Sequence, residues 1–326
     1  MTLLLVIIAV ALAVVFLAWM YTRRVDAAIN KQFPPSGKSL DVDGGSIHWQ
    51  ESGQGEPVVL IHGLSGNLHN FSAMESMLAE RYTVYSVDRP GSGHARRDVP
   101  ESANFEKQAS MLLEWMTKTG LDRALIVGHS MGGAIALKMA LIEPKRCAGL
   151  VLLCPLTAPL SEAAGPLKNL YIPNPATRRF LSATFATPVR MRKARENLSA
   201  IFAPDAAPRD FATRFGGALS MRSDTFFGAA NDIVAAQKSL YKQFRQYGDI
   251  SCPVGILFGG KDAVLAPSLH MKHIEDTIKD VTSVLLPERG HMVPISDPAA
   301  CSELVDTIYT KVKDTSGAPV SSTAEK

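Results

Sequence analysis

The sequence predicts an α/β fold: a mostly parallel central sheet with helices on both faces, an inserted helical lid and an N-terminal transmembrane helix. Three observations predict it. Short apolar runs alternate with helical patterns along most of the chain, this alternation stops between residues 156 and 248, and residues 3–20 form an unbroken apolar run. Strands that are buried on both faces read as continuous apolar runs, so the alternation favours a parallel sheet covered by helices.

The composition fits one large domain, or a core with a lid. The chain has 326 residues, of which 46% are apolar and 20% are charged, which excludes a disordered chain and a disulfide miniprotein. The mean hydropathy of +0.07 is high for a soluble enzyme, and the apolar run near the N-terminus is its main local source. A net charge of +3, from 34 basic and 31 acidic residues, gives no case for nucleic-acid binding, which needs a concentrated basic face.

The first element is the apolar run, which we expect to be a membrane anchor at residues 1–22. Its 18 residues would rise about 27 Å as a helix, close to the roughly 30 Å of a bilayer core. Trp19 and Tyr21 stand where interfacial aromatic residues lie. The alternative is a cleaved signal peptide, but the run is long, no Lys or Arg precedes it and no small-x-small site follows it. Arg23 and Arg24 favour a cytoplasmic position for the rest of the chain.

A linker at residues 23–39 leads to the core, which we assign to residues 40–155 and 249–313. The strands that the apolar runs predict are 46–50, 58–62, 83–88, 124–127, 149–154, 254–258 and 283–286. The helical patterns between them are 71–80, 105–119, 131–143, 268–278 and 298–312. Residues 314–326 are small and polar, which predicts a disordered tail.

The interruption at residues 156–248 predicts a helical lid. It carries 13 basic and 6 acidic residues, a net charge of +7, which leaves −4 on the remainder. Such a lid near a bilayer could be drawn to anionic headgroups, at about 1 kcal/mol per basic residue at the surface; the alternative is that these groups are solvated or salt-bridged. Apolar lid side chains could line an acyl channel or form plain lid core; they are Leu170, Phe180, Leu181, Phe185, Phe226 and Phe227.

Four widely spaced cysteines predict neither a disulfide framework nor a zinc site. They are Cys147, Cys154, Cys252 and Cys301. Three lie in or beside apolar stretches, so we expect buried thiols in a reducing compartment.

The sharpest local signal is ALIVGHSMGG at residues 124–133. A buried strand runs into Gly128-x-Ser130-x-Gly132 and then into a helical pattern, which is the context of a nucleophile elbow. Glycines beside the serine let the strand and helix approach closely. The pattern predicts Ser130 as a nucleophile; the alternative is a turn serine that caps the helix.

A nucleophilic serine needs a base and an orienting carboxylate. His291 and Asp262 each follow an apolar strand, at the sheet edge where catalytic side chains of open α/β sheets gather. The chain order Ser130, Asp262, His291 is the order expected for this kind of triad. Asp249 and Asp280 lie at strand beginnings, which is the opposite edge.

Other histidines have plainer interpretations. His270 and His273 are three residues apart on a predicted surface helix, so we expect a solvated face and not a metal site. His48 and His94 read as a strand and a loop residue. No metal and no organic cofactor is expected.

With these motifs the chain resembles the α/β-hydrolase fold superfamily, in its lid-bearing serine esterase or lipase-like branch, over about residues 40–312. The matching pieces are VVLIHG (58–63), VDRPGSG (87–93), GHSMGG (128–133), GGKD (259–262) and RGHMVP (289–294). The combination of membrane segment, serine elbow and lid is similar to membrane-anchored monoacylglycerol lipase-like enzymes.

The resemblance implies an oxyanion hole made by the backbone N–H groups of Leu64 and Met131, with His62 as a packed loop residue. A serine at the elbow argues against the relatives that use aspartate there, the dehalogenase and epoxide hydrolase types. The resemblance implies hydrolysis of lipid-like or apolar carboxylic esters at a membrane. Three alternatives stay open: a carbon–carbon bond hydrolase, a cofactor-free perhydrolase, and a non-catalytic binding protein.

Overall fold

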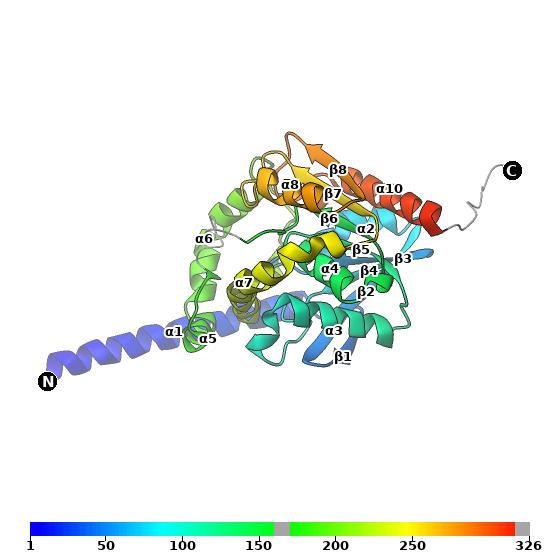
Figure 1. The fold of residues 1–326 in the computed structure, drawn as a ribbon. Helices are drawn as coiled ribbons and strands as arrows, with labels where there is room; N and C mark the ends of the chain where they lie inside the picture. Colours follow the sequence, from blue (N-terminus) through cyan, green and yellow to red (C-terminus); the bar gives the residue numbers. More distant parts are fainter. Residues whose placement is uncertain (160–169, 317–326) are drawn as a thin grey trace.

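The computed structural model describes residues 1–159 and 170–316 (Figure 1). Its centre is an eight-stranded sheet in the order β1-β2-β4-β3-β5-β6-β7-β8. The strands are β1 (Lys38–Val42), β2 (Gly45–Ser52), β3 (Glu56–Ile61), β4 (Tyr82–Asp88), β5 (Ala124–His129), β6 (Cys147–Leu153), β7 (Val254–Gly259) and β8 (Val281–Leu286). From β4 to β8 all neighbours are parallel, whereas β1, β2 and β4 pair antiparallel. The predicted mostly parallel sheet is confirmed.

Helices cover both faces of this sheet, as the sequence predicts. α2 (Ser72–Leu78) packs with α10 (Pro298–Ser316), which also contacts β6 and β7. On the other face α3 (Phe105–Lys118) and α4 (Met131–Ile142) pack together, and α8 (Pro267–Thr277) lies beside β7 and β8 (Figure 1). α4 starts directly behind β5 and is buried on nearly all sides, because almost every side chain in it is apolar.

The lid is helical in the residues that the structure describes. α5 (Pro175–Ala183), α6 (Ala186–Phe202) and α7 (Ser223–Gln243) lie between β6 and β7, and no strand occurs in the described parts of 156–248. Acidic lid side chains hold it to the core: Asp205 pairs with Arg289, and Asp232 pairs with Arg89 and Arg97. Two charged residues counted in the lid, Glu162 and Lys168, lie outside the described residues.

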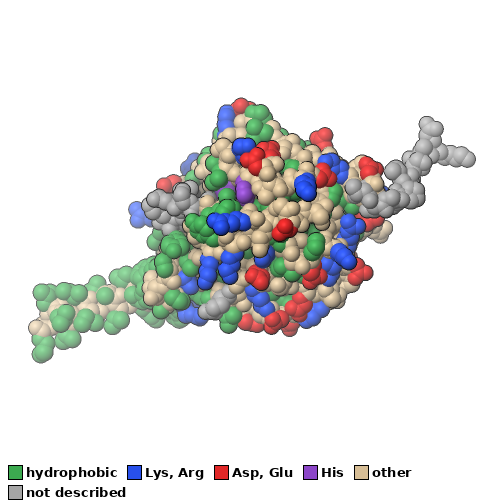
Figure 2. Space-filling view, viewed as in Figure 1, with side chains coloured by type: hydrophobic (Ala, Val, Ile, Leu, Met, Phe, Trp, Pro, Cys, Tyr) green, Lys and Arg blue, Asp and Glu red, His purple; other side chains and the backbone are tan. Residues whose placement is uncertain are grey.

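The N-terminal helix α1 (Thr2–Gln32) is long and apolar enough to cross a membrane. Its N-terminal part projects from the body, and apolar side chains cover this part (Figures 1 and 2). Leu3 is 74% exposed and Leu17 is 63% exposed, values that are unusual for a soluble protein.

The prediction of a linker at residues 23–39 needs correction, because α1 continues to Gln32 and β1 begins at Lys38. Lid contacts from side chains about two turns apart on α1 explain the continuation. Thr22 donates to the carbonyl of Thr184 at 2.7 Å, and Arg222 donates to Asn30 at 2.9 Å. The helix therefore runs directly onto the lid and ends before Pro34, which disfavours helical geometry in the residue before it.

Two terminal predictions also change. β1 was absent from the predicted strands because KSLDV at residues 38–42 has no apolar run, as is common for an exposed edge strand. α10 extends to Ser316, so the first residues of the predicted tail are helical, and residues 317–326 lie outside the described residues.

Candidate active site

Ser130 stands at the turn between β5 and α4 with φ 53° and ψ −119°. A residue other than glycine rarely adopts a positive φ, and it does so only where the surrounding structure holds it there. Three backbone hydrogen bonds fix this conformation of Ser130. Its N–H donates to Leu153 O at 2.9 Å, and its carbonyl accepts from the N–H groups of Gly133 and Leu156, both at 3.0 Å. The strand, the sharp turn and the helix that the sequence predicts are all present.

Close backbone contacts explain the glycines around this turn. A Cβ atom on Gly132 would lie 2.1 Å from the carbonyl oxygen of Ile61, and one on Gly128 would lie 2.5 Å from that of Gly132. A Cβ atom on Gly63 would lie 3.0 Å from the Cβ atom of Ser130. The loop after β3 therefore lies directly against the serine.

His291 and Asp262 form a buried pair beyond the ends of β8 and β7. His291 Nδ1 donates to Asp262 Oδ2 at 2.7 Å. The other carboxylate oxygen, Oδ1, accepts from the N–H groups of Val264 and Leu265 at 2.8 and 2.9 Å. Burial raises the pKa of Asp262, but His291 and these two N–H groups outweigh it, so the pKa is lowered overall. Asp262 is thus a carboxylate that fixes the ring of His291.

His129, the residue before Ser130, connects the turn at Ser130 with the loop that carries His291. His129 Nε2 donates to the carbonyl oxygen of His291 at 3.0 Å, and the two ring centroids are 5.0 Å apart. Ser130, Asp262 and His291 therefore each follow the carboxyl end of a parallel strand, and His129 links the turn at Ser130 to the His291–Asp262 pair.

Arg89 was missed by the sequence analysis and holds the loop at residues 62–64. Its fully buried guanidinium donates from Nε to His62 O at 2.9 Å and from Nη2 to Gly63 O at 3.0 Å. The carbonyl of Gly63 and the N–H of Leu64 belong to one planar trans peptide, so they point in opposite directions. Because that carbonyl is turned to Arg89, the N–H of Leu64 is turned away from it. The only sequence signal was the arginine in VDRPGSG, directly after β4.

His62 completes this loop as a neutral, packed residue. Its Nε2 accepts from the N–H of Arg89 at 3.0 Å, so the ring proton is on Nδ1, which donates to Gly63 O at 2.8 Å. Burial lowers the pKa of His62 to about 4.

His270 is not on a solvated face, so that prediction is wrong. It is buried, its Nδ1 accepts from the N–H of Thr157 at 3.2 Å, and burial lowers its pKa to about 4. The apolar periodicity placed His270 on a helix correctly. However, the backbone segment that follows β6, at Thr157, covers the face of the helix on which His270 lies. His273 is half-buried and donates to Phe244 O at 3.0 Å. His48, in β2, and His94, in a loop, lie where predicted.

One group of possible metal ligands overlaps the site. Atoms of Cys154, Asp262 and His291 lie within 4.8 Å of one another, and all three are buried. Burial raises the pKa of the Cys154 thiol, whereas a metal ion binds the thiolate. In addition, His291 Nδ1 and Asp262 Oδ2 are already hydrogen-bonded to each other. These residues do not fit a metal ion. Cys147 and Cys301 are likewise buried free thiols, and Cys252 is half-buried.

A mostly apolar cavity of about 420 Å³ lies between the lid and the loop after β3. Leu64 and Met292, which neighbour the site, are among its lining residues. Four of the six lid side chains singled out in the sequence line it: Leu170, Leu181, Phe185 and Phe226. Phe180 is instead 47% exposed, and Phe227 lines a second cavity.

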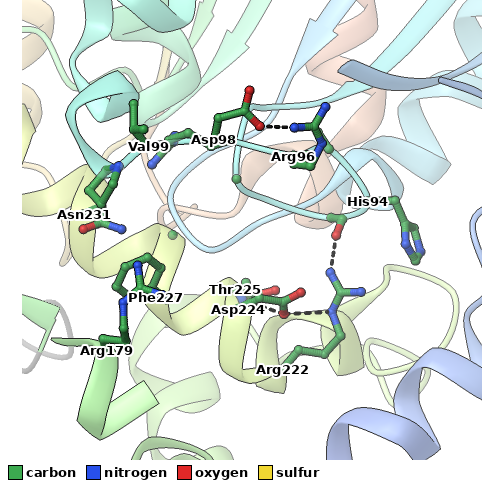
Figure 3. Close-up of a pocket in the computed structure, with 16 residues that line it drawn as sticks. His94, Arg96, Asp98, Val99, Arg179, Arg222, Asp224, Thr225, Phe227 and Asn231 are labelled. Carbon is green, nitrogen blue, oxygen red and sulfur yellow. Dashed lines mark hydrogen bonds and ion pairs between the residues drawn. The ribbon is translucent and has the colours of Figure 1, made fainter. Parts of the chain in front are cut away.

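The second cavity, of about 440 Å³, is lined by charged side chains and by none of the predicted site residues (Figure 3). Three of its four arginines have counter-charges: Arg96 pairs with Asp98, Arg97 with Asp232, and Arg222 with Asp224 at 3.5 Å. The apolar cavity is therefore the candidate substrate site.

Comparisons with known proteins agree on the fold. A family model described as alpha/beta hydrolase fold matches residues 56–298. A Pseudomonas putida protein named dihydrolipoyllysine-residue acetyltransferase component of acetoin cleaving system is 26% identical over 266 residues, 79% of this chain and 65% of that protein. Its namesake from Cupriavidus necator is 35% identical over 132 residues, 40% of this chain and 33% of that protein. The chain thus spans less than two-thirds of either relative.

Other similar proteins are named as ester hydrolases. Pimeloyl-[acyl-carrier protein] methyl ester esterase from Aliivibrio fischeri is 35% identical over 106 residues, 32% of this chain and 39% of that protein. A solved esterase from Thermogutta terrifontis superposes with a TM-score of 0.66 at 22% identity, covering 85% of this chain and 99% of that one. A structure named membrane phospholipase A superposes with a TM-score of 0.61 at 20% identity and covers 95% of this chain and 97% of that one. At these identities the two structures show a shared fold.

Proposed function

Because the chain belongs to the alpha/beta hydrolase fold family, we propose that it is a serine hydrolase that cleaves lipid-like or apolar carboxylic esters through an acyl-enzyme on Ser130. The observation that carries this proposal is the strained elbow: Ser130, at φ 53°, lies against the glycine loop after β3, and its neighbour His129 bonds to His291. A turn serine that merely caps α4 does not account for it, because the Ser130 side chain makes no cap hydrogen bond.

In the proposed reaction His291 takes the proton of the Ser130 hydroxyl as that oxygen attacks the ester carbonyl. Asp262 holds Nδ1 of the ring, so Nε2 is the nitrogen left for this proton. The tetrahedral intermediate collapses, His291 returns the proton to the leaving alcohol, and an acyl-enzyme remains. Water, deprotonated by His291, then releases the acid and restores Ser130.

The negative oxygen of the intermediate would bind the N–H groups of Leu64 and Met131. The peptide before Leu64 is fixed through Arg89, and Met131 is the first residue of α4, where unpaired N–H groups point along the helix axis. Donors that are already in place can each supply about 10² to 10³ in rate. Arg89 is thereby a positioning residue.

The substrate class follows from the cavity and from α1. The cavity lining is mostly apolar, which suits an acyl chain. We propose that residues 1–22 anchor the enzyme in a membrane, with Arg23 and Arg24 keeping the catalytic domain in the cytoplasm. The lid, with its net charge of +7, would then face anionic lipid headgroups.

The test is hydrolysis of p-nitrophenyl esters by the full chain in detergent, with Ser130→Ala and the exposed helix serine variant Ser76→Ala as its control. We expect turnover to vanish in Ser130→Ala and to persist in Ser76→Ala, and a fluorophosphonate probe to label only chains that keep Ser130. Undiminished turnover in folded Ser130→Ala would refute the proposal. Faster cleavage of a dienoic diketone than of a monoacylglycerol would assign the triad to carbon–carbon bonds instead.

A further inference from the structure

The apolar cavity contains a cation without a counter-charge. Arg190, on α6, lines the cavity, and its Nη2 donates to Ser65 Oγ at 3.2 Å. Its Nη1 is sealed from solvent and has no hydrogen-bond partner in the part of the chain that the structure describes. The guanidinium carbon lies 5.8 Å from the centre of the Phe226 ring, the one other interaction that orients it there.

A sealed cationic donor without a partner is energetically costly. Removing a charge from water is unfavourable unless an opposite charge or a full set of hydrogen bonds replaces the water. Burial lowers the pKa of Arg190 to about 10, and no ion pair to it occurs among the described residues. Arg89 and Arg97 differ from it, because they share Asp232 at 3.0 and 2.6 Å. Among the described residues nothing neutralises Arg190, so its unpartnered Nη1 would be stabilised by an anionic ligand.

The position of this donor relates it to the proposed chemistry. Ser65, which Arg190 contacts, directly follows Leu64, and adjacent α-carbons are about 3.8 Å apart. Lys193 lies one turn further along α6, is exposed and lines the same cavity, so it extends the positive charge toward solvent. If an ester carbonyl is held at Leu64, an anionic group bound to Arg190 could belong to the same molecule, separated from the ester by only a few covalent bonds.

We propose that Arg190 binds an anionic group, a phosphate or a carboxylate, carried by the same molecule as the scissile ester. The substrates are then anionic amphiphiles, with an apolar chain in the cavity and a charged group against α6. A guanidinium suits both anions because its planar donors match two oxygens at once. This inference rests on the proposed ester hydrolysis, so its first test is independent of turnover.

That test measures binding to the full chain carrying Ser130→Ala, by titration calorimetry with octyl phosphate, octanoate and 1-octanol. Adding Arg190→Gln should weaken binding of the anions by about 10- to 100-fold, the range expected for a hydrogen bond to a charged group, and leave 1-octanol nearly unaffected. Arg190→Lys should restore part of the loss. Arg192→Gln, an exposed neighbour on α6, is the matched control and should change nothing. Whichever of octyl phosphate and octanoate loses more affinity in Arg190→Gln shows whether the group that Arg190 binds is a phosphate or a carboxylate.

The second test compares turnover of 1-lauroylglycerol 3-phosphate and 1-lauroylglycerol, which share an acyl chain and differ in charge. Arg190→Gln should raise KM for the phosphate at least ten times more than for the neutral ester, with kcat little changed. An equal loss on both substrates, or equal weakening of all three octyl ligands, would overturn the proposal in favour of a structural or oxyanion role. If Ser130 is not a nucleophile, turnover is absent for both esters while the octyl phosphate titration still reports on Arg190.

One further variant addresses the lid residues outside the described ranges. Glu162 is the acidic residue among residues 160–169. Tighter octyl phosphate binding in Glu162→Gln would identify an internal counter-charge and would also overturn the proposal.

Discussion

Buried neutral histidines make the protein sensitive to acid. Burial lowers the pKa of His62 and of His270 to about 4, and burial together with the charge of His291 lowers that of His129 to about 3. In the unfolded chain these groups titrate near 6.5. Between pH 6.5 and 4 the unfolded chain therefore binds protons that the native state excludes, so the free energy of unfolding falls as the pH falls.

We predict that this loss reaches up to about 1.4 kcal/mol per pH unit for each such histidine, and that His270→Gln makes the pH dependence shallower. The measurement is urea denaturation at pH 7.5, 6.5, 5.5 and 4.5. The half-buried neighbour His273→Gln serves as the control on the same helix. A free energy of unfolding that stays constant or rises from pH 6.5 to 4.5 would contradict this account.

Residues whose roles depend on local pattern were predictable, and those whose roles depend on distant contacts were not. The sharp turn at Ser130 was predictable because the strand, glycines and helix around it are contiguous in the sequence. Arg89 and Arg190 were not, because their partners lie 26 and 125 residues away, at Gly63 and Ser65. Whether a buried arginine has a counter-charge is a property of packing, on which the sequence is silent.

At the scale of elements, the elbow depends on how closely β3, β5 and α4 approach. We predict that Gly132→Ala lowers stability by roughly 1–3 kcal/mol, as overpacking does, and lowers turnover strongly. The reason is that its Cβ atom would lie 2.1 Å from the backbone oxygen of Ile61, which cannot rotate away. The displaced backbone would carry Ser130 with it.

Thermal unfolding and p-nitrophenyl ester turnover would be measured together for this variant. Gly248→Ala is the matched control, because the nearest atom to its added Cβ is 3.6 Å away, an ordinary contact. If the two alanine variants melt and turn over alike, close approach at the elbow is not what the glycine provides.

The elements also show where apolar periodicity is informative. The seven predicted strands all occur because each carries apolar residues, which the helices on the two faces bury in most of these strands and cover only partly in β8. β1 has no such run, since its pattern is mostly exposed and only Val42 is buried. The helix at residues 267–277 was predicted, but which of its faces is covered depends on the chain after β6, far away in the sequence.

At the scale of the whole molecule, the projecting helix and the lid form one continuous structure. Asp26 accepts hydrogen bonds from the N–H and hydroxyl of Ser223, the first residue of α7, at 2.9 and 2.6 Å. A carboxylate there also opposes the positive end of the helix α7. The predicted linker is thus replaced by about ten further helical residues, about 15 Å of helix, which contact the lid at Thr22, Asp26 and Asn30. These contacts would fix the orientation of the lid relative to a membrane-anchored α1.

We therefore predict that Asp26→Asn separates activity at a membrane from activity in solution. Losing the charge should cost about 1 kcal/mol of lid attachment and speed hydrogen exchange in the first turn of α7. Hydrolysis of a monoacylglycerol embedded in anionic vesicles should fall several-fold, because the lid is no longer held at the surface. Hydrolysis of p-nitrophenyl butyrate in detergent should change little, because Asp26 contacts the start of α7 and is not a lining residue of the apolar cavity. Asp249→Asn, an exposed carboxylate before β7, is the control. Equal losses on both substrates would mean that α1 supports the catalytic core itself, and no loss on either would mean that the lid presents its cavity to the membrane without α1.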